Sequence, residues 1–240
     1  MVYKLIAANQ DLSILSTRSP IQETTDLKAQ GEILTLWNLV CSHVGHPAPE
    51  FLTASRSTLS ALQESKDRVV QRGIAHCLLS LYGNRQNHAE LLTPGLQILI
   101  AIQDTPDLAA QRAIADCLHL LSQNHENHPE LRTTGLPILS ALKETKDPEV
   151  QKTIRDCLIY LFENDQIPEA LPSLLKTGLP ILSAILQTAD YEVKWSIGTC
   201  LRNLAKNTKT HDVLRANNLA QLRHKPANSS SRYNSIINSI

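Results

Sequence analysis

The sequence predicts an all-α protein built from stacked helical repeats, and three observations support this prediction. ALQESKD at 61–67 returns as ALKETKD at 141–147. Cys77, Cys117 and Cys157 fall 40 residues apart, and each is followed by leucine. Aromatic residues make up only 4% of the chain, so the core must consist of Leu, Ile, Val and Ala, which suits helix packing better than a β-sandwich. A fixed period of this length is typical of a solenoid, because one unit cannot bury its apolar face alone.

The clearest unit begins at Gly135. Apolar residues at helical spacing predict a short middle helix after this glycine, and they are Leu136, Ile138, Leu139 and Leu142. Asp147 followed by Pro148 predicts the start of a long helix, because aspartate accepts an orphan backbone N–H and proline has none to lose. The inward positions of that helix are Val150, Ile154, Cys157, Leu158 and Leu161. With one short helical turn at 128–132, we expect three helices in each unit.

Other units align with this one. Gly95 and Gly178 open equivalent units, whereas Ser55 takes the glycine position in an earlier unit and Asn218 takes it in the last. The recurrent glycine predicts a sharp left-handed turn between the first two helices. The expected caps of the other long helices are Asp67, Asp107 and Asp190. We therefore expect an N-terminal cap and partial repeat at 1–50, repeats at 51–84, 85–124, 125–164 and 165–207, and a partial repeat with a polar tail at 208–240.

Composition narrows the class of protein. The 23 basic and 23 acidic residues give a net charge of zero, which argues against general affinity for nucleic acid. No apolar run is long enough to span a bilayer, and the first residues lack the features of a secretory signal. Three of the five cysteines recur with the repeat, which indicates small core residues in a reducing compartment. We therefore expect a cytoplasmic or nuclear protein that does not bind membranes.

One unit reads as Gly-x-Pro-x-Leu, a polar turn, Asp-x-Glu-Val and a helix with Cys-Leu-x-x-Leu. This pattern resembles the armadillo repeat, and the resemblance covers roughly residues 26 to 224. Single units are also similar to HEAT repeats. The resemblance implies a right-handed α-α superhelix of three-helix repeats, an armadillo-like solenoid. Its long helices would line a concave groove that holds an extended peptide or a protein partner.

The resemblance also implies which side chains line the groove. Many armadillo proteins clamp a peptide with an asparagine and a tryptophan of the long helix. Asn203 and Asn38 match the asparagine position, but Tyr160 and other residues replace it in the middle units. The tryptophan position holds His76, Asp116, Asp156 and Thr199. One turn earlier lie Arg72, Arg112, Lys152 and Trp195.

The helical wheel places Lys152 and Asp156 opposite the apolar face of their helix, with Tyr160 at its edge. We expect this mixed row to suit a polar or acidic peptide with hydrophobic anchors, and Trp195 is the candidate anchor. Alternatively, the charged pairs merely solvate one helix face, and Trp195 covers the last apolar layer.

Residues that could support chemistry are few. The segment CSHVGH at 41–46 has metal-binding residue types, but no fourth ligand follows at suitable spacing. His88 and His128 precede short helices in equivalent units, which favours a structural role, and the repeated cysteines occupy core positions. The chain has no phosphate-binding glycine loop, HExxH or GxSxG. We therefore expect no catalytic residue, no metal and no cofactor.

Binding is therefore the expected function. The sequence favours a non-catalytic scaffold or adaptor that holds a protein or an extended peptide in its groove, with self-association through incomplete end repeats as a further possibility. The alternative is a nucleic-acid-binding or DNA-repair protein built on HEAT-like repeats, which requires a continuous positive band. A third possibility, which the Asn/Ser/Ile-rich tail suggests, is a small secreted effector or adaptor of a bacterium.

Overall fold

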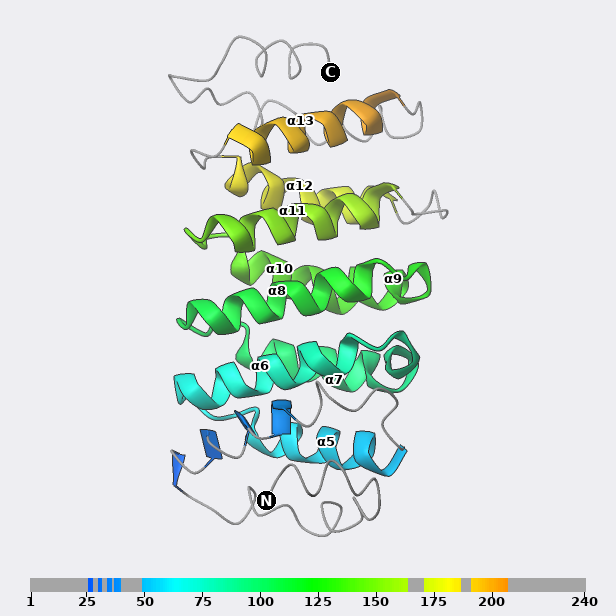
Figure 1. The fold of residues 1–240 in the computed structure, drawn as a ribbon. Helices are drawn as coiled ribbons and strands as arrows, with labels where there is room; N and C mark the ends of the chain where they lie inside the picture. The colour runs from blue at the N-terminus through cyan, green and yellow to red at the C-terminus, as the bar shows by residue number, and fades with distance from the viewer. Residues whose placement is uncertain are drawn as a thin grey trace. The chain divides into compact units, whose positions relative to one another are not determined.

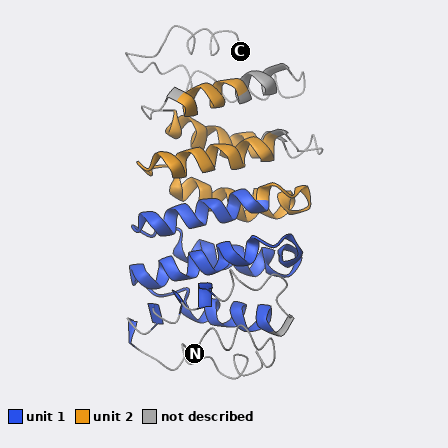
Figure 2. Ribbon diagram, in the orientation of Figure 1, with its two compact units in different colours: residues 1–121 blue, residues 122–240 orange. Residues whose placement is uncertain are grey.

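The part of the chain that the structure describes is helical and contains no strand, as the sequence predicts. This computed structural model describes residues 26–27, 30–31, 34–35, 37–39, 49–163, 171–186 and 191–206. The chain divides into two compact units, Met1–Leu121 and Ser122–Ile240 (Figure 2). Several residues of the sequence argument lie outside the described ranges: Cys41, His43, His46, Asp190 and Asn218.

Unit 1 contains long helices that pack against partner helices (Figure 1). Its elements are α5 (Pro49–Leu62), α6 (Arg68–Tyr82), η1 (Arg85–Asn87), α7 (His88–Ile102) and α8 (Leu108–Ser122). The described residues between 27 and 39 are also helical, and some of them contact α6. The thiol of Cys77 donates to the Leu34 carbonyl at 3.4 Å, and the Ser80 hydroxyl donates to Asn38 Oδ1 at 2.7 Å.

Unit 2 repeats this arrangement with one irregular helix. The irregular helix consists of α9 (His128–Glu130), a π-helical turn η3 (Leu131–Gly135) and α10 (Leu136–Leu142), and η2 (His125–Asn127) precedes it. The other helices are α11 (Pro148–Glu163), α12 (Leu171–Ile185) and α13 (Tyr191–Lys206). α11 packs against both α12 and α13, and α10 packs against α12.

A hydrogen-bonded turn starts the long helices α6, α8 and α11, and α6 shows it fully. Asp67 Oδ1 accepts from the backbone N–H groups of Val69 and Val70 at 2.9 and 3.0 Å. The Ser65 hydroxyl accepts from the Asp67 N–H at 3.3 Å, and the Gln71 amide donates to the Ser65 carbonyl at 3.0 Å. We call this set of bonds the aspartate turn. It satisfies N–H groups that have no partner within the helix.

The aspartate turn recurs before α8 and α11. Asp107 caps α8 by accepting from the Ala110 N–H at 2.9 Å, and Asp147 caps α11 by accepting from the Glu149 N–H at 3.0 Å. Gln111 and Gln151 donate to the Thr105 and Thr145 carbonyls, as Gln71 does to Ser65. The predicted caps Asp67, Asp107 and Asp147 are therefore confirmed.

The inward face of the long helices is also confirmed. The five apolar residues that the sequence assigns to the core of α11 are all buried, as are Cys77 and Cys117 in unit 1. The side chain of Cys200 lies outside the described residues.

The predicted break at the recurrent glycine is wrong. Gly95 lies inside α7 and Gly178 inside α12, and Gly135 has helical backbone angles of φ −75° and ψ −40°. Ser55 likewise lies inside α5. The expected short and middle helices therefore join into one, although proline at positions 94 and 180 favours a break. In the described ranges, one partner helix therefore stands between successive long helices where two were expected.

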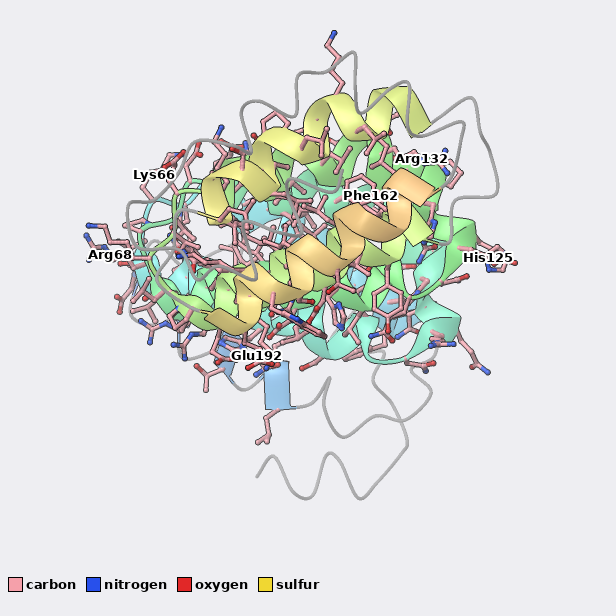
Figure 3. The ribbon with its side chains drawn as sticks, turned by 90° about the horizontal axis from the view of Figure 1, so that it is seen from above. Lys66, Arg68, His125, Arg132, Phe162 and Glu192 are labelled. Atoms are coloured by element: carbon pink, nitrogen blue, oxygen red, sulfur yellow. The ribbon has the colours of Figure 1, made fainter. Side chains whose placement is uncertain are left out.

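Close packing explains Gly95 and Gly178. A Cβ atom at Gly95 would lie 1.9 Å from Tyr82 Oη, and one at Gly178 would lie 2.7 Å from Cζ of Phe162, which Figure 3 shows among the helices. The Tyr82 hydroxyl donates to the Leu91 carbonyl at 3.1 Å, so its ring cannot easily move away. The glycine is therefore required because an aromatic side chain lies against the helix backbone.

Gly95→Ala tests this explanation. The overpacked methyl group should lower the free energy of unfolding by about 1–3 kcal/mol, although alanine is the better helix former by about 1 kcal/mol. The loss should be smaller in a Tyr82→Phe background, which removes the nearest atom. Urea unfolding measures both effects. Gly83→Ala is the control, because Gly83 is exposed with φ −55°; equal losses at the two glycines would contradict the explanation.

Candidate partner-binding surface

Four predicted groove residues lie in unit 1, on the long helices α6 and α8. Arg72 and His76 are one turn apart on α6, as are Arg112 and Asp116 on α8. Both arginines are exposed, whereas His76 and Asp116 are half-buried. The predicted row thus reaches the surface of this unit, with its basic residues the most accessible.

Arg72 has a structural partner that the sequence analysis missed. Its Nε donates to Asp107 Oδ1 at 3.0 Å, and its Nη2 pairs with Asp107 Oδ2. Asp107 is buried and also caps α8 through the Ala110 N–H. The hydrogen bond from Arg72 lowers the pKa of Asp107 below its ordinary value, against the opposing effect of burial. Arg72 therefore ties α6 to the turn before α8.

In unit 2, the polar face of α11 carries Lys152, Asp156 and Tyr160. Lys152 and Tyr160 are exposed, and Asp156 is half-buried. Oδ1 of Asp156 accepts from both Nε and Nη2 of the buried Arg155, at 2.9 and 2.7 Å. Because a buried guanidinium needs a counter-charge, Asp156 has a structural role as well. Lys152 is the exposed cation of this face.

The candidate anchor is exposed. Trp195 lies on α13 with 53% of its surface accessible, and Tyr160 on the adjacent α11 is 38% accessible. The Thr199 hydroxyl donates to the Trp195 carbonyl at 3.0 Å, so its donor is already used. Asn203 belongs to α13, but its side chain lies outside the described residues. The described face of α11 and α13 therefore combines two aromatic rings with Lys152.

The repeated histidines are structural, as predicted. Nε2 of His88 lies 2.8 Å from the Tyr82 carbonyl, and Nε2 of His128 lies 2.8 Å from the Ser122 carbonyl. Both imidazoles are buried at the start of the partner helix. Each ring therefore links the end of one helix to the beginning of the next.

The repeated thiols lie in the core. Burial raises the pKa of Cys157 to about 12 and the pKa of Cys117 well above its ordinary value. A thiol in this state is a poor nucleophile and a poor metal ligand. Within the residues that the structure describes, no three His, Cys, Asp or Glu side chains cluster closely enough to hold a metal ion.

Sequence reasoning missed several residues that the structure brings forward. Gln71, Gln111 and Gln151 each stand four residues after a capping aspartate, and this fixed spacing was a usable signal. Val69 and Leu108 are exposed beside two of these caps. Both residues precede the first inward-facing residue of their helix, and this pattern predicts that they are exposed.

No protein-family model matches this chain, and no curated protein matches its sequence. Among the helices of the described ranges, none is both long enough and apolar enough to cross a bilayer.

The Arg72–Asp107 pair predicts a pH dependence of stability. The pKa of Asp107 is lower in the folded state, so its contribution is present above the ordinary value of 3.8 and is lost as pH falls through the folded pKa. In the Asp107→Asn variant, the free energy of unfolding should therefore fall by less between pH 6 and pH 2 than it does in the wild type. Urea unfolding across this range measures the effect.

A second variant controls this experiment. Arg72→Gln should reduce the same acid-dependent loss, and the double variant should reduce it no further than Asp107→Asn alone, because one interaction is removed. Additive effects of the two substitutions would show that the ion pair is not responsible.

The buried thiols should resist alkylation. At pH 8 iodoacetamide should modify Cys117 and Cys157 only as fast as the protein unfolds, because neither thiolate forms readily in the core. Peptide mass spectrometry distinguishes these positions from the other cysteines, and 6 M urea provides the fully reactive control. Rapid modification of either residue in the native protein would be inconsistent with this arrangement.

Proposed function

We propose that this protein is a non-catalytic, armadillo-like binding module that acts as a cytoplasmic scaffold or adaptor. It binds a protein or an extended peptide along the exposed faces of its long helices. The observation that carries the proposal is the exposure of Trp195 on α13, beside the helix that carries Tyr160 and Lys152.

An exposed tryptophan favours binding on energetic grounds. Tryptophan and tyrosine bury a large apolar area while keeping a polar group, and they have few rotatable bonds to immobilise. Free in solution, Trp195 leaves about half of its surface in water. A partner that covers this ring gains hydrophobic free energy without disturbing the core. Lys152 supplies a charge that can orient the partner.

The charges of this face favour a protein partner over nucleic acid. Exposed Glu149 and Lys152 lie on α11, and exposed Glu192 lies near the start of α13 (Figure 3). Signs therefore alternate on these helices, whereas a phosphate backbone requires a continuous basic surface. An extended or helical segment with both polar and apolar side chains fits a mixed surface better.

The groups with shifted pKa values support binding over catalysis. In the described ranges, these groups are the ion pair Arg72–Asp107 and the buried side chains of Tyr82, Cys117 and Cys157. All have structural positions, either in the core or in an ion pair between two helices. The proposal therefore assigns no catalytic role to this face.

Affinity capture tests the proposal. Trp195→Ala should reduce partner recovery from lysate by about tenfold or more, as expected for loss of an interface anchor. Lys152→Glu should weaken capture less and make it more dependent on salt. Lys176→Glu on α12 is the matched control, since Lys176 is also an exposed lysine of unit 2. Thermal unfolding should be nearly unchanged in all three variants. Identical capture by Trp195→Ala and wild type would contradict the proposal.

A further inference from the structure

No further inference is drawn: the strongest candidate, the surface patch at the starts of α6 and α8 in unit 1, where Val69 and Leu108 are exposed, carries none because nothing in the described part of the chain shows what covers it.

Discussion

The aspartate turn is the interaction on which the helical units depend. A long helix begins with N–H groups that have no partner within it, and one carboxylate provides for two of them in α6 and α11. A glutamine four residues after the aspartate donates a hydrogen bond to the carbonyl two residues before it. The backbone of the turn therefore has little conformational freedom. An N-cap contributes about 1 kcal/mol, but its greater effect is to fix the residue at which the helix begins. That starting residue determines which positions face inward in every unit.

A second constraint acts at the other end of the long helix. Tyr82 and Phe162 are buried against Gly95 and Gly178 of the partner helix, each within its own unit. The pair of constraints fixes both the start and the packing of the helix, and it leaves the polar face free to vary. Asp107 shows how these roles combine, since one carboxylate caps α8 and also holds Arg72 of α6. Exposed positions near the caps are therefore held in place without forming part of the core.

Local signals made the caps and the inward faces predictable. Asp107 and Asp147 bond to residues two or three positions away, and helical period alone assigns Ile154 and Cys157 to the core. The glycines were misinterpreted because their cause is tertiary: Gly95 responds to a tyrosine thirteen residues earlier in the sequence, beyond the reach of turn chemistry. The partner of Arg72 was missed for the same reason, as the two residues are separated by 35 positions. For the candidate site, the helical period predicted the exposed face, and the structure shows that Arg72 and Asp156 also have structural partners.

Comparison of the sequence repeats distinguishes the residues that the fold requires from those that differ from one repeat to the next. The position five residues after the capping aspartate holds Arg72, Arg112, Lys152 and Trp195 in successive sequence repeats. Arg72 binds Asp107, but the start and inward face of each described helix are already defined by the cap and the apolar stripe. The first helical position likewise changes from Arg68 to Leu108 to Pro148. A helical protein can alter exposed positions that make no structural contact with little effect on folding. Chemical differences between units at these positions are therefore where we expect partner specificity to lie.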